Sequence, residues 1–255
     1  MMSHDSETST TSPRVAIVTG ASAGIGAATA LMLALRGWHV LAVARRHDRL
    51  ANLARQSAAS GAPGHIEPLA LDVTASDAPS CIVAAARRLT ASGRIDALVN
   101  NAGAGLFKPL TEITDEAWRR LMTLNLEAPF RLTREVLPTM IEQRSGSIIN
   151  VSSVAGSTTI PKGSAYCASK HALEAMSGCL VEEVRQFGVR VTLICPGSVA
   201  SEFLDASDGL PTRAFPDQSW MIQPEHVAVA IADAIEAPGN TFTARIELRP
   251  LVRPS

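Results

Sequence analysis

Short runs rich in Val, Ile and Leu alternate along this chain with longer segments whose apolar residues recur at helical spacing. This alternation constrains the fold more than any other feature, because repeated strand–helix–strand units build a parallel sheet. Right-handed crossovers place the helices on both faces of such a sheet. We therefore predict a doubly wound α/β fold with a mostly parallel, seven-stranded sheet. The strands are expected at residues 15–19, 40–44, 68–71, 97–99, 147–151, 189–194 and 246–248.

Helices are expected in the segments between these strands. They are predicted at residues 26–35, 48–59, 76–91, 114–143, 164–187 and 224–235. Pro129 and Pro138 fall within the longest of them, and because each removes a backbone donor, we expect a kink or a break there. The segment 201–223 combines turn-forming Gly and Pro residues with apolar side chains, as connections that cover a binding site often do. We interpret it as a substrate lid, with a disordered surface loop as the alternative.

Composition limits the organisation and the partners of the chain. Residues 1–12 are polar and rich in Ser and Thr, which predicts a disordered tail, and residues 13–255 are expected to form one catalytic domain. A formal net charge of −1 provides no positive field to attract nucleic acid or an anionic membrane. The longest apolar run, residues 27–35, is far shorter than the roughly 20 residues that cross a bilayer. The cysteines and histidines lack metal-ligand spacing, so we expect a cytoplasmic protein without a metal, its cysteines buried as small hydrophobes.

A glycine-rich segment at residues 19–26, Thr-Gly-Ala-Ser-Ala-Gly-Ile-Gly, lies directly between the first predicted strand and the first predicted helix. Glycines let the backbone turn tightly and approach a pyrophosphate, while the amides at the helix N-terminus face the anion. At this place in an alternating α/β chain, the segment favours a dinucleotide site over a purely structural turn. The residues assigned to the site are Gly20, Ser22, Gly24, Ile25 and Gly26.

The end of the second predicted strand indicates which dinucleotide is bound. A carboxylate at this point would bind the ribose hydroxyls of NAD, whereas arginine pairs with the additional phosphate of NADP. The chain has Arg45 and Arg46 there and no acidic residue. We therefore expect NADP(H) as the cofactor. The alternative is that both arginines belong to an ordinary solvated loop.

A serine, a tyrosine and a lysine carry the catalytic prediction. Reduction of a carbonyl by hydride places negative charge on oxygen, so the site needs a hydrogen-bond donor and a proton source. Tyr166 is the only tyrosine, and Lys170 lies one helical turn later, where its ammonium is expected to lower the pKa of the phenol. Ser153 follows the fifth strand at the carboxyl edge of the sheet and can donate to the substrate oxygen. The spacing alone also fits a packed tyrosine and a solvated lysine on an amphipathic helix.

Taken together, these motifs resemble those of the short-chain dehydrogenase/reductase family over residues 15–248. Besides the glycine turn, the matching elements are Leu-Asp-Val at 71–73, Asn-Asn-Ala-Gly at 100–103, Asn125, Ser153, Tyr-Cys-Ala-Ser-Lys at 166–170 and Pro-Gly at 196–197. The resemblance implies a Rossmann-type fold. It also implies a homodimer or homotetramer assembled through the helices at 114–143 and 164–187.

The resemblance further implies roles for single residues. Asn125 would hold a water in a proton path that runs through Lys170 and the ribose hydroxyl to Tyr166, and Tyr166 and Lys170 would also contact the cofactor. The other cofactor contacts are assigned to Asp72 and Val73 at the adenine, to Asn100, Ala102 and Gly103 at the ribose, and to Pro196, Gly197, Val199 and Ser201 at the nicotinamide. The family commonly has threonine where this chain has Ser201. It sometimes has a basic residue where this chain has Ala23, which leaves Arg45 as the main expected partner of the 2′-phosphate.

These observations predict an NADPH-dependent carbonyl reductase, reversible as an alcohol dehydrogenase, in which Tyr166 is the general acid and base for a small ketone or aldehyde. The alternative is a non-catalytic NADP-binding sensor or regulatory subunit with the same fold. The residues expected to shape the substrate pocket are mostly apolar, which favours a hydrophobic or mixed carbonyl compound over a charged sugar phosphate. They are Leu106, Val154, residues 158–160, Phe203, Trp220 and Met221.

Overall fold

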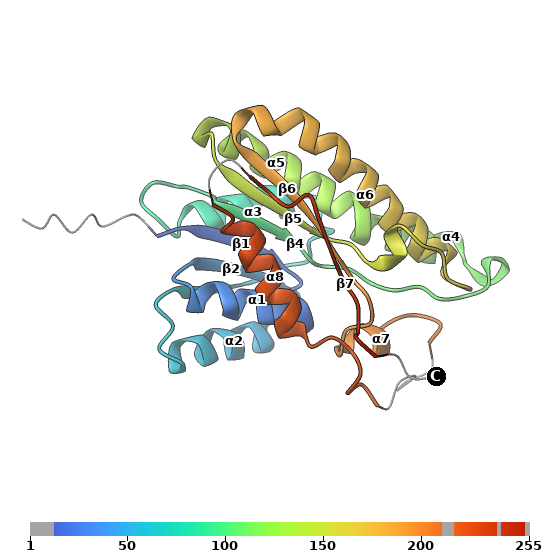
Figure 1. Cartoon of the computed structure of the whole chain (residues 1–255). Coiled ribbons are helices and arrows are strands. Elements are labelled where there is room, and N and C mark those ends of the chain that lie inside the picture. The colour runs from blue at the N-terminus through green and yellow to red at the C-terminus, as the bar shows by residue number, and fades with distance from the viewer. Residues whose placement is uncertain (1–12, 211–216, 239–240, 253–255) are drawn as a thin grey trace, which may run out of the picture.

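The computed structural model describes residues 13–210, 217–238 and 241–252, and these ranges contain a seven-stranded sheet (Figure 1). The strand order is β3-β2-β1-β4-β5-β6-β7, and every neighbouring pair is parallel. The strands are β1 (Val15–Thr19), β2 (His39–Ala44), β3 (His65–Ala70), β4 (Ala97–Asn100), β5 (Gly146–Val151), β6 (Val189–Pro196) and β7 (Arg245–Leu248). The predicted parallel sheet is confirmed.

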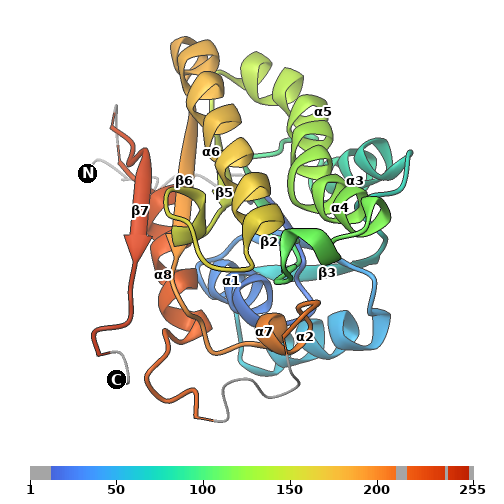
Figure 2. The same cartoon turned by 90° about the vertical axis from the view of Figure 1, so that its right-hand side faces the viewer.

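Helices cover both faces of this sheet, as predicted (Figures 1 and 2). One face carries α1 (Gly24–Leu35), α2 (His47–Ala59) and α8 (Pro224–Ile235), and the other carries α3 (Ala78–Arg87), α5 (Ala128–Gln143) and α6 (Ser164–Val184). Successive residues of β1 point into the two cores: Val18 packs with the first group of helices and Ile17 with the second. Because both faces are buried, the central strands are apolar at nearly every position, which is why the sequence revealed them.

The edge strand β3 begins earlier than expected. It spans His65–Ala70, whereas the sequence suggested residues 68–71. Pro68 lies inside it, paired with Ala42 of β2, its one neighbour in the sheet. An edge strand tolerates a proline because one side of its backbone forms no ladder, so the proline marked the interior of this strand rather than its start.

The long helical segment is broken, but not at either proline. It consists of α4 (Asp115–Met122), a π-helical turn at Thr123–Glu127, and α5. Pro129 lies in the first turn of α5, and Pro138 lies within that helix. Pro129 lacks the N–H that would bond to the carbonyl four residues earlier, at Asn125, and the helix widens over that turn. The widened turn places Asn125 in the buried interior.

The remaining differences concern helix ends and cysteines. The third predicted helix, 76–91, is shortened to α3, and α6 ends in a separate 3₁₀ turn at Arg185–Phe187. The segment 201–223 contains a short helix, α7 (Glu202–Asp205), while its residues 211–216 and the predicted tail at 1–12 lie outside the described residues. The prediction that the cysteines are buried holds for Cys167 and Cys195 and is wrong for Cys81 and Cys179, which lie on outward helix faces. Among the described helices, none is long and apolar enough to cross a membrane.

Candidate active site

The glycine turn, residues 19–26, has contacts that leave little room for a Cβ atom at its three glycines. Gly20 and Gly24 have φ values of +67° and +51°, in the left-handed region that glycine adopts readily. A Cβ atom at Gly26 would lie 2.4 Å from the carbonyl oxygen of Gly20. Helix α1 begins at Gly24, and its N-cap residue Ala23 supplies no side-chain hydrogen bond, so the first amides remain available to an anion. This arrangement fits the pyrophosphate of a dinucleotide.

A second turn, after β4, is bonded to the glycine turn through two residues that sequence analysis did not single out. The Thr19 hydroxyl donates to the Val99 carbonyl at 3.2 Å and accepts from the amides of Asn101 at 3.0 Å and Ala102 at 3.1 Å. The Asn101 side-chain amide donates to the Thr19 carbonyl at 2.9 Å. Both residues belong to the quoted motifs, and their role follows only from the pairing of β1 with β4.

The two arginines after β2 have different partners. Arg46 donates to the Ser22 hydroxyl of the glycine turn from Nε at 3.0 Å and from Nη2 at 2.9 Å. Arg45 is exposed and close enough to Asp72 that its charge contributes to a lowered pKa of that carboxyl. The larger cause is the hydrogen bond that the Thr74 amide donates to Asp72. The structure thus joins Arg46 to Ser22 and sets Arg45 near Asp72.

Two of the residues expected at the ribose have different environments. The Asn100 side chain is buried and donates to the Thr133 hydroxyl at 3.1 Å and to Asn150 Oδ1 at 2.8 Å, so it ties β4 to β5 and α5. Gly103 lies beside the catalytic residues, since a Cβ there would be 3.3 Å from Asn125 Oδ1 and 3.7 Å from Lys170 Nζ. The Asn100 side chain is therefore part of the interior, whereas Gly103 faces the reacting groups.

Tyr166 and Lys170 lie one turn apart on α6, and both are buried. The Lys170 ammonium donates to the Val151 carbonyl at 2.9 Å and lies 6.0 Å from the centre of the Tyr166 ring. Ser153 follows β5, accepts from the Ala155 amide at 3.2 Å, and forms a hydrogen bond with the Tyr166 phenol. The structure therefore brings together the serine, tyrosine and lysine predicted from sequence.

Asn125 connects the turn after β4 to α6. Its Oδ1 accepts from the Ala104 amide at 2.9 Å, and its Nδ2 donates to the Ala104 carbonyl at 2.9 Å and to the Ser169 hydroxyl at 3.1 Å. Ser169, which sequence analysis did not assign, donates in turn to the Tyr166 carbonyl at 2.8 Å. Asn125 thereby holds the Gly103 turn at a fixed position relative to Tyr166.

The segment after β6 lies against the glycine turn. The Gly197 amide donates to the Leu248 carbonyl at 2.8 Å, and Val199 forms an isolated bridge with Ile222. The Ser201 hydroxyl caps α7 by accepting from the Phe203 amide at 3.4 Å. Ser201 Cβ is 3.1 Å from the position that a Cβ at Gly24 would occupy. Pro196, the last residue of β6, begins this segment.

The family model for short chain dehydrogenases matches residues 14–208. This chain belongs to the short-chain dehydrogenase/reductase family. It is 33% identical over 238 residues to an uncharacterized oxidoreductase of Staphylococcus saprophyticus, covering 93% of this chain and 97% of that protein. It is 36% identical to a 3-oxoacyl-(acyl-carrier-protein) reductase of Thermotoga maritima, covering 79% of each. The crystal structure of a metagenomic short-chain oxidoreductase in complex with NADP matches with a TM-score of 0.79 and 38% identity, covering 94% of this chain and 98% of that one.

As a short-chain dehydrogenase/reductase, the protein is an oxidoreductase with a Rossmann-type fold, and Tyr166 is shielded from water. Burial raises the pKa of Tyr166 to about 12, although the hydrogen bond with Ser153 acts in the opposite direction. Burial also lowers the pKa of Lys170 to about 8, against the charges of Cys195 and Glu174. The net pKa of the phenol is therefore raised, and not lowered as expected from the neighbouring Lys170. Removal from water has a larger effect on the pKa of Tyr166 than the neighbouring amine has.

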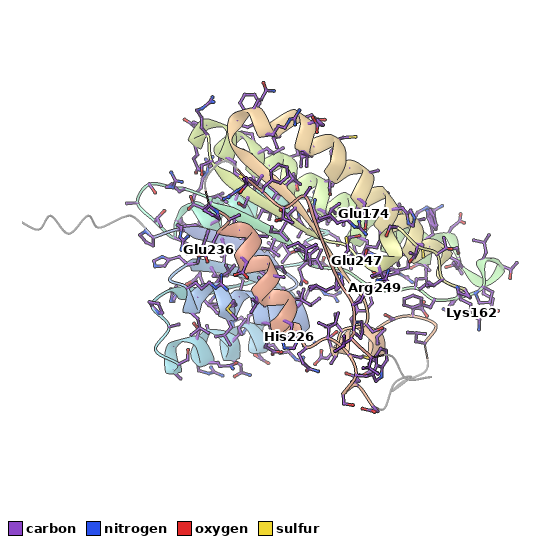
Figure 3. All side chains as sticks on the ribbon, viewed as in Figure 1. Lys162, Glu174, His226, Glu236, Glu247 and Arg249 are labelled. Carbon is purple, nitrogen blue, oxygen red and sulfur yellow. The ribbon has the colours of Figure 1, made fainter. Side chains whose placement is uncertain are left out.

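Glu174, one turn beyond Lys170, attaches this part of α6 to the last strand (Figure 3). Its Oε1 accepts from the Ser152 hydroxyl at 2.9 Å, and its Oε2 pairs with Arg245 of β7 at 2.5 Å. Arg245 also pairs with Glu247 at 3.3 Å. Sequence analysis did not assign this partly buried ion pair, because its members are far apart in the chain.

Two phenylalanine rings, which we call the aromatic cover, flank Tyr166 in this oxidoreductase. The ring centre of Phe107 lies 5.3 Å from that of Tyr166, and the ring centre of Phe203, from α7, lies 5.8 Å away. The Phe107 amide donates to the Asp208 carbonyl at 2.8 Å, and Lys108 pairs with the Asp208 carboxylate at 2.6 Å. The segment with α7 is thus bonded to the loop after β4 directly over Tyr166. Phe203 was predicted as a pocket residue, and Phe107 was not.

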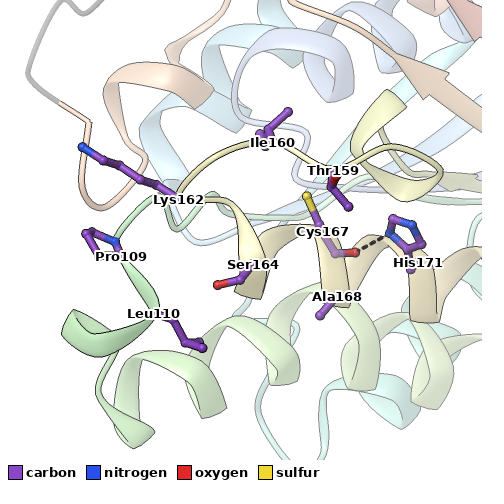
Figure 4. Close-up of a pocket in the computed structure, with 9 residues that line it drawn as sticks. All are labelled: Pro109, Leu110, Thr159, Ile160, Lys162, Ser164, Cys167, Ala168 and His171. Atoms are coloured by element: carbon purple, nitrogen blue, oxygen red, sulfur yellow. Dashed lines mark hydrogen bonds between the residues drawn. The ribbon is translucent and has the colours of Figure 1, made fainter.

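A cavity of about 510 Å³ lies on the neighbouring side of α6 (Figure 4). Two of its walls are formed by the loop before α6 and by the loop around Pro109. Its lining consists of Pro109, Leu110, Thr159, Ile160, Lys162, Ser164, Cys167, Ala168 and His171. Of the predicted pocket residues, Thr159 and Ile160 line it, whereas Leu106 packs in the interior with Leu121. The cavity therefore adjoins the catalytic helix without being lined by Tyr166.

Proposed function

We propose that this oxidoreductase is an NADPH-dependent carbonyl reductase, reversible as an alcohol dehydrogenase, that acts on a small ketone or aldehyde. The observation that carries the proposal is the meeting of Ser153, Tyr166 and Lys170 beside the glycine turn at the carboxyl ends of β1, β4 and β5. Ligands of open α/β sheets bind at this edge.

The residues present fit a dinucleotide. The backbone of Gly20, Gly24 and Gly26 would hold the pyrophosphate, and Ser22 with Arg45 and Arg46 would hold the 2′-phosphate of NADP. Asp72 and Val73 would contact the adenine, Ala102 and Gly103 the ribose, and the segment from Pro196 to Ser201 the nicotinamide. The NADP complex of the metagenomic relative supports this choice of cofactor. A bound reduced nicotinamide supplies the hydride.

The side chains of this chain would provide the proton and stabilise the charge. As negative charge develops on the carbonyl oxygen, the Ser153 hydroxyl donates a hydrogen bond to it and the Tyr166 phenol transfers its proton. A phenol with a pKa of about 12 is protonated throughout the physiological pH range, which is the form that reduction requires. The nearby Lys170 ammonium then stabilises the phenolate that remains. Asn125 holds the Gly103 turn beside these groups.

The surroundings of the site support an apolar or mixed substrate and an assembly. The side chains that flank Tyr166 are aromatic, and α7 with the rest of segment 201–223 would act as the substrate lid. Trp118 of α4 and Phe130 of α5 are exposed large apolar side chains, and we propose that a homodimer or homotetramer buries them. The proposal places the enzyme in the cytoplasm, where its four free cysteines would stay reduced.

The test is a screen of NADPH oxidation over ketones and aldehydes, comparing the wild-type enzyme with Tyr166→Phe. Removing the hydroxyl should reduce turnover of any accepted substrate by roughly a hundredfold or more, because the proton donor is lost. NADPH affinity, measured by fluorescence titration, should stay within about twofold, since the ring and its packing remain. Near-normal turnover by Tyr166→Phe would contradict the assignment of Tyr166 as the general acid. Tight NADPH binding without turnover of any compound would instead favour the sensor.

A further inference from the structure

We propose that the Glu202 carboxylate occupies the place of the 2′-phosphate on Arg46 and Arg49, and that NADP(H) must displace it whereas NAD(H) need not. Glu202 would then be a specificity-determining residue that weakens NADP(H) binding and holds α7 in position when no cofactor is bound. This inference rests on the proposed cofactor. It concerns a residue that neither the motifs nor the catalytic proposal uses.

The first observation is that two guanidinium groups converge on one carboxylate. Arg46 Nη1 pairs with Glu202 Oε2 at 2.8 Å, and Arg49, from the first turn of α2, pairs with Oε1. Arg46 also donates to Ser22, so the hydroxyl, both arginines and the carboxylate form one cluster. A serine hydroxyl and two arginines are the donors that a phosphate monoester prefers. Here a carboxylate from another part of the chain occupies them.

The second observation is electrostatic. The hydrogen bonds from Arg46 and Arg49 hold the pKa of Glu202 below its usual range. The residue therefore remains an anion at any pH at which a dinucleotide binds. A 2′-phosphate brought to the same arginines meets this fixed negative charge, and like charges at such separations disfavour one another. The ribose hydroxyl of NAD(H) carries no charge and does not meet this opposition.

The third observation is the position of Glu202 between two other contacts of α7. Ser201, on one side of it, lies against Gly24 of the glycine turn, and Phe203, on the other, packs on the Tyr166 ring. Figure 2 shows α7 next to α1 and α2. Three successive residues thus contact the pyrophosphate turn, the arginines and the catalytic tyrosine. Breaking the Glu202 pairs would release the anchor of α7 at the arginine end.

The expected effect is moderate because the cluster is half exposed. The side chains of Arg46, Arg49 and Glu202 retain 46%, 46% and 50% of their accessible surface. Exposed ion pairs contribute little each, so displacing two of them should change an affinity by about three- to tenfold. The effect should also decrease as salt concentration rises.

The test compares Glu202→Gln with the wild-type enzyme in direct titrations of NADPH and NADH. The variant should bind NADPH about three- to tenfold more tightly, because the opposing charge is gone, and its affinity for NADH should change by less than about twofold. Asp208→Asn is the matched control. It removes the Lys108 pair that anchors the same segment at its other end, at a distance from the arginines, so it should alter NADPH and NADH binding by the same factor.

Equal effects of Glu202→Gln on both dinucleotides, or no effect on NADPH, would overturn the inference. A double variant with Arg49→Gln provides a second measurement, since the gain from Glu202→Gln should shrink when one of its two partners is already absent. Failure of the proposed function has a different signature. The wild-type enzyme would then bind neither dinucleotide, or would prefer NADH in the titrations and show no NADPH-dependent turnover, which would also overturn the inference.

Discussion

The glycine turn and the aromatic cover meet at the same active site but are constructed in opposite ways. The turn is held by close backbone packing and by hydrogen bonds: Gly26 has no room for a Cβ, and the Thr19 hydroxyl and the Asn101 side-chain amide bond the turn to the segment after the neighbouring strand. The cover is held by side chains, with Phe107 and Phe203 approaching Tyr166 from segments far apart in sequence. A turn without space for a Cβ tolerates little change, whereas two rings from separate loops can move or vary.

This difference separates the cofactor side of the proposed active site from its substrate side. The rigid half recognises what every member of such a family shares, a dinucleotide with a pyrophosphate. In the proposed function, the adaptable half would surround the carbonyl compound, and its two rings flank the phenol of Tyr166. The following predictions test this division with variants at Lys170, in the glycine turn and in the aromatic cover.

The largest effect is expected at Lys170, where the two regions meet. Its pKa of about 8 in the folded protein is below the ordinary 10.5, so between these pH values the unfolded chain binds more protons. Stability should therefore rise from pH 8 to pH 10.5, by about 3 kcal/mol at 1.36 kcal/mol per pKa unit, and be lost as the pH falls back through that window. The rise should be missing in Lys170→Met, measured by urea unfolding.

The prediction concerns the difference between the unfolding free energies of the wild type and Lys170→Met at each pH. The raised pKa values of Tyr166 and Cys195 reduce stability as the pH rises above 9 to 10, but both groups are present in the variant as well. Because the charge of Cys195 also raises the pKa of Lys170, the two curves are compared from pH 8 to pH 9, well below the pKa values of Tyr166 and Cys195 in the folded protein. Parallel curves for the wild type and Lys170→Met would mean that the lysine is solvated. Lys170 would then not belong to the buried place where the glycine turn and the aromatic cover meet.

The second effect tests the rigidity of the glycine turn. Gly26→Ala places a methyl group 2.4 Å from the Gly20 carbonyl and 2.5 Å from Asn101 Nδ2, so the backbone must shift. We expect a loss of about 2 kcal/mol in unfolding free energy, within the range for overpacking, and loss of most NADPH affinity. Gly178→Ala in α6 is the control, because nothing lies within 4 Å of its Cβ position and alanine favours a helix. Should both variants behave alike, the turn is not rigid.

The same division explains what could be predicted from the sequence. The central strands were recognisable because burial on both faces makes them almost continuously apolar, and Gly20, Gly24 and Gly26 because their constraint is local. The pairing of Tyr166 with Lys170 follows from helical spacing. Each of these depends on residues close together in the chain.

What was missed depends on distant contacts. The Phe107–Tyr166 stack requires knowing how two loops meet. The raised pKa of Tyr166 was missed for the same reason, since burial cannot be read from the spacing of a tyrosine and a lysine. Side-chain packing between segments has no local sequence pattern.

The smallest effect tests the aromatic cover, and the chain offers a direct reporter. Tyr166 is the only tyrosine, so ultraviolet titration of phenolate reports on this residue alone. Phe203→Ala should admit water to one face of the ring and lower the pKa from about 12 to about 11, equivalent to 1.36 kcal/mol. Phe130→Ala, which removes an exposed ring from α5, should leave the pKa unchanged.

NADPH titration of Phe203→Ala completes the comparison. If the cover serves the substrate side alone, NADPH affinity should stay within about twofold while the pKa of Tyr166 falls, because the glycine turn keeps its hydrogen bond from Asn101. A pKa that stays near 12 would mean that other groups than Phe203 keep the phenol dry. An NADPH affinity that falls tenfold with Phe203→Ala would join the cover to the cofactor site, and the two regions would then act as one unit connected through α7.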